Sequence, residues 1–214
     1  LAALQPEILV VMAYGQILRK NILTLASRAI INLHASLLPK YRGAACIQAA
    51  IDAGDSHTGI TAMHVVRELD AGDIILAKSI PIPPEETGGS LHDKLADLAA
   101  DVLTETLELL ENDTAPRIPQ EPALVSYIPK LDREHGRIDW TMPAAALERR
   151  IRAYDPWPGT YTEAIENGSP KRLKIHPPTA VVETSLPPGE VSIEASRLIV
   201  GCGTHSLELF QVQP

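Results

Sequence analysis

The sequence predicts an α/β layered domain followed by a small domain of short strands. Two apolar runs, residues 7–13 and 29–33, are typical of strands buried on both faces. Residues 89–111 repeat leucine and valine at steps of mostly three and four, which predicts one long amphipathic helix. After Pro116 the chain instead carries one helical stretch and several short alternating runs. Strand–helix alternation favours an α/β layer fold, and the later short strands favour a β-barrel.

The first domain, residues 1–115, alternates between the two element types. Tyr14 and Gly15 end the first strand, and a loop, residues 34–43, follows the second and is unusually apolar at residues 36–39. Prolines from Pro81 onward stop the last strand. Beyond those already named, we predict a short helix at 19–26, a helix at 44–53, and strands at 58–66 and 73–81.

Residues 116–130 are rich in proline and are the best candidate for a linker. The second domain then runs over residues 131–214, with a helix at about 144–153. Asn167-Gly168 is a strong hairpin signal inside it. The strands expected there are 160–166, 172–182, 189–193, 197–200 and 206–212.

Composition narrows the class of protein. The 214 residues are 45% hydrophobic and 21% charged, with no apolar run long enough to span a membrane and no secretory leader. Two isolated cysteines, Cys46 and Cys202, form neither a disulfide framework nor a zinc site, and reduced thiols are expected. The seven histidines show no metal-ligand spacing. A net charge of −8 argues against a surface coated by nucleic acid, although a local basic patch is compatible with it.

Three polar residues could carry chemistry. Asn32 and His34 are two apart at the end of a predicted strand, so their side chains point to the same side. Ligands of open parallel sheets bind at the carboxyl ends of strands. Asp70 follows the next strand and could orient the imidazole from the same edge. On spacing alone, an ordinary hydrogen-bonded histidine and a turn-forming aspartate are the favoured interpretations of these residues.

The motifs around these residues resemble the folate-dependent formyltransferase family. Asn32-Leu-His-Ala-Ser-Leu-Leu-Pro-Lys-Tyr-Arg-Gly43 is similar to its signature, and Leu69-Asp-Ala-Gly72 to the turn that carries its aspartate. Ala13–Leu18 resembles the stretch that lines its pterin pocket. Three matched pieces in the right order are far more specific than any one of them. The resemblance implies a Rossmann-like core.

Later motifs resemble methionyl-tRNA formyltransferases in particular. They are Tyr127–Lys130, Gly136–Trp140 and Arg152–Gly159, so the resemblance extends over essentially the whole chain. It implies an OB-like barrel at the C-terminal end, a monomeric cytoplasmic enzyme, and initiator methionyl-tRNA as partner, with no membrane. It also implies that the family's first βαβ segment and the last part of the barrel lie outside this chain. Cys46 and Arg19 stand where the family commonly has proline.

The resemblance also assigns roles in transferring a formyl group from 10-formyltetrahydrofolate to an amine, without a metal. Asn32 would donate to the developing oxyanion, His34 would stand beside the same oxygen, and Asp70 would support the imidazolium and relay protons. The implied folate-pocket residues are Gln16, Ile17, Leu18, Val66, Arg67 and Glu68. On the acceptor side the implied residues are Ser36, Leu38, Pro39 and Arg42.

Alternatives remain open for several residues. Ile17 and Leu18 could simply pack in a core, and Arg42 could be a solvated loop charge rather than a phosphate contact. Nine of the 19 basic residues lie between positions 130 and 174, interleaved with acids, so an ordinary solvated face rivals a tRNA surface. Our preferred tRNA contacts are Lys171, Arg172 and Lys174.

Three other functions also fit the sequence. A formyltransferase acting on an amino-sugar nucleotide would share the folate half, and a formyltetrahydrofolate hydrolase would replace the amine by water. A non-catalytic binding module is the third, and the intact set of Asn32, His34 and Asp70 argues against it.

Overall fold

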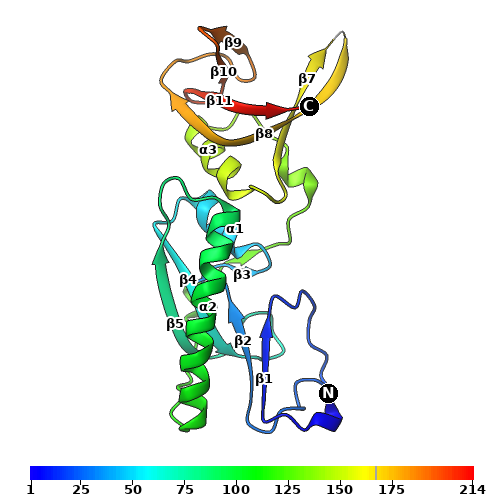
Figure 1. The fold of residues 1–214 in the computed structure, drawn as a ribbon, viewed down its shortest axis with the longest axis vertical. Coiled ribbons are helices and arrows are strands. Elements are labelled where there is room, and N and C mark those ends of the chain that lie inside the picture. The colour runs from blue at the N-terminus through cyan, green and yellow to red at the C-terminus, as the bar shows by residue number, and fades with distance from the viewer. Residues whose placement is uncertain (167) are drawn as a thin grey trace. The chain divides into compact units, whose positions relative to one another are not determined.

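The computed structural model of the protein describes residues 1–166 and 168–214 (Figure 1). The chain divides into two compact units. Unit 1 comprises Leu1–Ala50, Ser56–Ile82 and His92–Lys130, and unit 2 comprises Ile51–Asp55, Pro83–Leu91 and Leu131–Pro214. The proline-rich residues 116–130 therefore belong to unit 1, while the domain boundaries stay a prediction.

Unit 1 is built on a four-stranded sheet with strand order β1-β2-β4-β5 (Figure 1). All four predicted strands are present, as β1 (Ile8–Met12), β2 (Ala29–His34), β4 (His57–His64) and β5 (Ile74–Pro81). Only β1 and β2 run parallel, because β4 pairs antiparallel with both β2 and β5. The sheet is thus mixed rather than wholly parallel. A continuous apolar run shows that a strand is buried on both faces, but it does not show whether the neighbouring strand is parallel or antiparallel.

Burial in unit 1 concentrates on the central strands and on the part of helix α2 (Gly88–Glu111) that follows Leu91. Ile31 of β2 and Ile60 of β4 are completely buried. The predicted apolar face of α2 is confirmed, since Leu95 and Val102 are at most 1% exposed. An ion pair of 2.6 Å between Lys78 Nζ and a Glu105 carboxylate oxygen joins β5 to this helix.

Two local expectations differ from the structure. Residues 19–26 form hydrogen-bonded turns instead of a helix, because the Ile22 and Leu25 amides bond to carbonyls three residues earlier and no continuous i→i−4 ladder follows. The loop after β2 contains a two-residue strand, β3 (Arg42–Gly43), which pairs parallel with β6 (Tyr127–Ile128) of the proline-rich segment. The helix expected at 44–53 is present as α1 (Cys46–Ala53).

Unit 2 contains α3 (Ala144–Ala153) and a five-stranded antiparallel sheet with strand order β7-β8-β11-β10-β9. Leu147 and Ile151 of α3 pack with Leu207 and other residues of the sheet in one core. All five predicted strands are present, and closure of the sheet into a barrel stays a prediction. The strands are β7 (Thr160–Glu166), β8 (Ser169–Val182), β9 (Val191–Glu194), β10 (Arg197–Gly201) and β11 (Ser206–Gln213).

Short 3₁₀ turns complete the described residues, at Ala2–Leu4, Pro122–Leu124 and Arg133–Gly136. Of the hairpin signal Asn167-Gly168, Asn167 lies outside the described residues, and Gly168 has a φ of +79°. Within the described part of the chain, no helix combines the length and the apolar character needed to cross a membrane.

Candidate active site

Strand β2 places Asn32 and His34 on one side of the sheet. Strand alternation directs both side chains to the same face, while Ile31 and Leu33 point to the buried opposite face. His34 is 7% exposed, whereas Asn32 is half-buried. The Asn32 carboxamide forms no hydrogen bond to any of the described residues. Its N–H groups are therefore available to a ligand.

The ring of His34 lies between two acceptors. Nε2 is 2.8 Å from the carbonyl oxygen of Tyr41. A carbonyl only accepts, so Nε2 carries a hydrogen in this arrangement. Nδ1 is 3.7 Å from Oδ2 of Asp70, which is longer than a hydrogen bond but within ion-pair range. Nδ1 is consequently the ring nitrogen that faces the carboxylate.

Asp70 reaches His34 by a route that strand order does not provide. Asp70 lies in the loop after β4, and β4 runs antiparallel to β2. Asp70 itself adopts a left-handed backbone conformation, with a φ of +49°. Its Oδ2 accepts a hydrogen bond of 2.8 Å from the Gly43 amide. Gly43 has a φ of +111°, and a Cβ there would lie 2.2 Å from the Ile128 carbonyl oxygen. Only glycine brings this amide to the carboxylate without displacing the backbone.

Hydrogen bonds of Ser36 and Leu38 hold the loop after β2 in place. The Ser36 hydroxyl donates to the Lys40 carbonyl at 2.7 Å and is fully buried. The Thr61 hydroxyl accepts from the Leu38 amide at 3.1 Å and donates to the Ser36 carbonyl at 2.6 Å. The Leu38–Pro39 bond, left open by the sequence, is cis. These contacts shape the wall beside His34, and Pro39 is only half-buried.

Arg42 is 8% exposed, so the solvated loop charge considered for it is wrong. Its Nε and Nη2 donate to Oε1 of Gln120 at 3.0 and 2.7 Å, and its Nη1 donates to the Tyr127 hydroxyl at 3.2 Å. Its guanidinium also lies 5.8 Å from the centre of the Tyr127 ring. A role in contacting phosphate stays a prediction.

Sequence reasoning missed Gln120, which lies in the predicted linker. Its Nε2 donates to the carbonyl oxygens of Asp70 and Gly72 at 2.8 and 2.9 Å. A glutamine among prolines carries no signal of such contacts. The tertiary pairing of this segment with β3 and with β5 brings it to the site.

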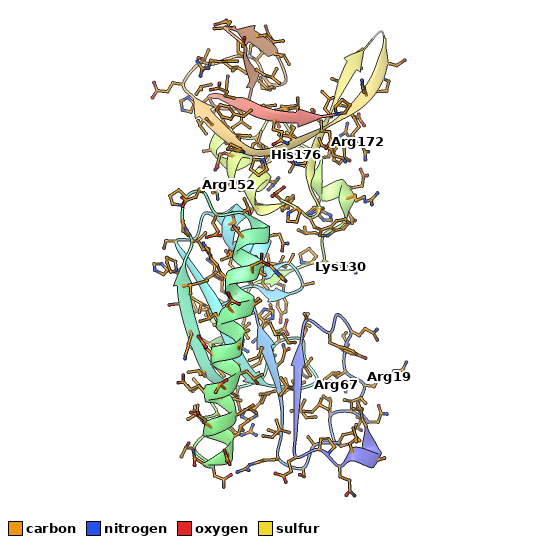
Figure 2. The ribbon with its side chains drawn as sticks, viewed as in Figure 1. Arg19, Arg67, Lys130, Arg152, Arg172 and His176 are labelled. Atoms are coloured by element: carbon orange, nitrogen blue, oxygen red, sulfur yellow. The ribbon has the colours of Figure 1, made fainter. Side chains whose placement is uncertain are left out.

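The predicted folate residues lie on two exposed segments of unit 1. Gln16 and Ile17 follow β1, and Ile17 is 79% exposed, so the alternative of core packing for Ile17 is wrong. The amides from residue 14 to 18 form no hydrogen bond within the described part of the chain. Free amides suit the polar edge of a pterin. The other predicted residues are the half-buried Leu18 and the exposed Val66, Arg67 and Glu68, with Arg67 labelled in Figure 2.

The predicted tRNA contacts all lie exposed on β8 of unit 2. Alternation places Arg172 and Lys174 on one face and Lys171 on the face that leads to the buried Ile175. The guanidinium of Arg172, labelled in Figure 2, stacks 3.9 Å from the centre of the Tyr161 ring. Other cations of this region are paired internally, as in Arg137–Glu163, Arg150–Asp52 and Arg152–Glu148.

The two cysteines are buried, as core thiols should be, and burial raises the pKa of each to about 11. Neither Cys46 nor Cys202 therefore supplies a thiolate nucleophile near neutral pH. Across residues 1–166 and 168–214, no group of three or more His, Cys, Asp or Glu side chains is arranged to hold a metal ion.

Comparison with known families decides the assignment. The formyl transferase domain matches residues 1–107, and the formyl transferase C-terminal domain matches residues 130–214. The chain belongs to the formyl transferase family. As a formyl transferase, it has Asn32, His34 and Asp70 gathered at the end of β2, within the first matched region.

Curated relatives of this formyl transferase chain include two that match its whole length. The methionyl-tRNA formyltransferase of Akkermansia muciniphila is 50% identical over 216 residues, which cover 100% of this chain and 69% of that protein. The methionyl-tRNA formyltransferase of Moorella thermoacetica is 45% identical, with 100% and 68% covered.

Solved structures show the same fold at low identity. HypX from Aquifex aeolicus, determined with tetrahydrofolic acid, has a TM-score of 0.73 at 20% identity and covers 99% of this chain and 36% of its own. WlaRD, a sugar 3N-formyl transferase, has a TM-score of 0.73 at 18% identity and covers 98% and 75%. At these identities the likeness establishes the fold of this formyl transferase and nothing finer about its acceptor.

Proposed function

We propose that the chain transfers the formyl group of 10-formyltetrahydrofolate to the amino group of methionyl initiator tRNA. The observation that carries the proposal is the meeting of three groups at the end of β2: a carboxamide without a partner, an imidazole held by a carbonyl, and a carboxylate held by an amide. The identity of 45–50% to methionyl-tRNA formyltransferases supports the acceptor. The enzyme would act in the cytoplasm as a monomer, without a membrane.

The reaction is acyl transfer, so negative charge develops on the formyl oxygen as the amine attacks. Asn32 supplies the oxyanion donor, because its N–H groups are free and do not titrate. A donor already fixed on a strand needs little reorganisation as the charge forms. Removal of one such donor typically lowers the rate by about 10²–10³.

His34 and Asp70 provide the proton route. The Tyr41 carbonyl fixes the ring through Nε2, which leaves Nδ1 on the side of the carboxylate at 3.7 Å. In its protonated form Nδ1–H would stabilise the oxyanion, and Asp70 would balance the ring's charge. The proton lost by the amine is then passed, directly or through water, toward the departing folate nitrogen.

The two substrates would occupy different surfaces of unit 1. Gln16, Ile17, Leu18, Val66, Arg67 and Glu68 would hold the folate, whose formyl group supplies the chemistry. The loop containing Ser36, Leu38, Pro39 and Arg42 would shape the acceptor side, from positions next to His34. In unit 2, Lys171, Arg172 and Lys174 would contact tRNA phosphates.

A formyl-transfer assay tests the proposal on the full-length gene product, with 10-formyltetrahydrofolate and either methionyl initiator tRNA or an amino-sugar nucleotide. We expect formyl-methionyl-tRNA, lost in His34→Ala. Product with the sugar nucleotide alone would keep the folate half and overturn the tRNA half. Release of formate without either acceptor would favour a hydrolase, and no turnover at all would favour a binding module.

A binding measurement tests the tRNA surface separately. Reversal of Lys171, Arg172 and Lys174 to glutamate should weaken tRNA binding and lower the slope of log K against log salt, by about 0.9 for each lost phosphate contact. As a control for one reversed charge, Lys94→Glu on α2 should match the parent while Lys174→Glu should not. Unchanged affinity and slope in the triple variant would sink this surface.

A further inference from the structure

The carboxamide of Gln120 uses its full hydrogen-bonding capacity at the site. Nε2 donates to the carbonyls of Asp70 and Gly72 at 2.8 and 2.9 Å. Oε1 accepts from Nε and Nη2 of Arg42 at 3.0 and 2.7 Å. An amide has two donor hydrogens and two acceptor positions, so all four are satisfied in one orientation. A side chain in this state is held rigidly.

Its partners belong to the two segments that meet at the Asp70 carboxylate. One is the turn from Asp70 to Gly72, whose carbonyls Gln120 holds. The other is β3, where Arg42 directly precedes Gly43, the residue whose amide donates to Oδ2 of Asp70 at 2.8 Å. Gln120 therefore joins the backbone that carries the carboxylate to the backbone that binds it.

The turn has few other supports. Val66 and Leu69 ahead of it are 40% and 51% exposed, so packing does not fix this stretch. Asp70 itself has a φ of +49°, a conformation that costs a non-glycine residue about 1–3 kcal/mol and persists only where its surroundings hold it. Beyond the turn, the next anchor is the hydrogen bond of 2.9 Å from the His64 amide to the Asp73 carbonyl.

The segment that carries Gln120 is itself fixed on both sides. Ile118 exchanges two backbone hydrogen bonds with Ile74 of β5, at 2.8 and 3.0 Å. Ser126 accepts from the Tyr41 amide through its hydroxyl and from the Arg42 amide through its carbonyl, both at 2.8 Å. The backbone that carries Gln120 is therefore fixed on both sides of this residue, at Ile118 and at Ser126, and does not behave as a flexible linker.

We propose that Gln120 is a positioning residue for formyl transfer, which sets the place of the Asp70 carboxylate opposite Nδ1 of His34. The role rests on the proposed function, since it matters only if Asp70 acts in the reaction. Gln120 touches neither substrate in this scheme. It acts on kcat through the carboxylate, and a shift of catalytic groups by about 1 Å can lower a rate by about 10²-fold.

The near-isosteric Gln120→Glu separates the two halves of the contact. A carboxylate would bind Arg42 at least as well, but it would face two carbonyl oxygens without a hydrogen to donate. In the full-length enzyme we expect kcat to fall by about 10–100-fold, with KM for 10-formyltetrahydrofolate within about threefold of the parent. Gln48→Glu on α1 makes the same chemical change elsewhere in unit 1 and should leave both values unchanged.

A double-mutant cycle with Asp70→Asn distinguishes positioning from general damage. If Gln120 acts through Asp70, Gln120→Glu and Gln120→Met should lower kcat much less in the Asp70→Asn background than alone. Independent, multiplicative losses would overturn the role, as would a kcat for Gln120→Glu within threefold of the parent. Absence of formylated product from the parent enzyme would instead overturn the proposed function itself, and a urea midpoint for each variant identifies loss of folding.

Discussion

Replacement of Asp70 by asparagine removes one charge while keeping the shape of the side chain. An asparagine carbonyl can still accept from the Gly43 amide, which lies 2.8 Å from Oδ2 in the parent. The turn should therefore hold its place, and the change falls on the group opposite Nδ1 of His34 at 3.7 Å. What is lost is the balance of the ring's positive charge at the step in which the ring is protonated.

The size of this effect follows from the distance and the burial. The side chains of His34 and Asp70 are 8% and 11% exposed, so solvent screens their interaction weakly. At 3.7 Å and an effective dielectric constant of about 20, two unit charges interact by about 4 kcal/mol. This is an upper value for a step in which only part of the charge develops. We therefore expect kcat to fall by about 10²–10³-fold.

Single-turnover formylation of methionyl-tRNA, at saturating formyl donor, measures the step directly. Asp73→Asn is a matched control in the same loop, since its carboxylate is 37% exposed and lies 3.8 Å from Arg117 rather than at the site. The control should keep its rate within about twofold. If Asp70→Asn were also within a few-fold of the parent, the charge of Asp70 would play no part in the reaction.

Three further outcomes follow from the structure. Asn32→Ala should lower kcat by about 10²–10³-fold with little change in the urea midpoint, and an unchanged rate would refute its role as oxyanion donor. Gly43→Ala should destabilise by about 2–4 kcal/mol in urea unfolding, because φ is +111° and the new Cβ would meet backbone 2.2 Å away. Its control Gly15→Ala, with φ +72° and open space, should lose only about 1–2 kcal/mol. Finally, Arg197 lowers the pKa of Glu208 below its ordinary 4.5, so the pair stabilises above that pH and the effect is lost on acidification. In Arg197→Met, the free energy of unfolding should therefore fall less steeply as the pH drops below about 4.5. An unchanged dependence of this free energy on pH would contradict the stabilising role of the Arg197–Glu208 pair.

Much of the fold could be predicted because the spacing of apolar residues and the positions of turn-forming residues agree with the helices and strands of the structure. The leucine and valine repeat of α2 appears as buried Leu95 and Val102, and the apolar run of β2 is one of the two central strands of the sheet. Strand alternation predicted that Asn32 and His34 share one side, whatever their partners, while the resemblance of the surrounding motif assigned their roles. Such local rules need no knowledge of the rest of the chain. They held for all nine predicted strands of the described residues.

Strand direction and the partners of Arg42 could not be predicted, because both depend on contacts far along the chain. Nothing in the composition of β4 distinguishes a parallel from an antiparallel neighbour. Although β4 runs antiparallel to β2, the loop after it still brings Asp70 to Gly43 and His34. A solvated loop charge stayed open as the alternative for Arg42 because its two acceptors, Gln120 and Tyr127, lie 78 and 85 residues away. Pairing over that distance leaves no periodic trace in the sequence.

The proline-rich residues 116–130 have the composition of a linker, but they also hold part of the candidate site in place. Proline fixes the φ angle and removes an amide donor, and proline-rich composition is typical of linkers. The same stiffness suits a structural support, since the chain is fixed at Ile118 and at Ser126 and turns in a short 3₁₀ helix at Pro122–Leu124 between them. Gln120 is thereby held between two anchors at little cost in entropy. The formyl transferase domain matched by similarity ends at residue 107, yet the groups that hold Asp70 continue to Gln120. The physical boundary of the site therefore lies past the boundary that similarity draws, within the segment that composition assigns to neither domain.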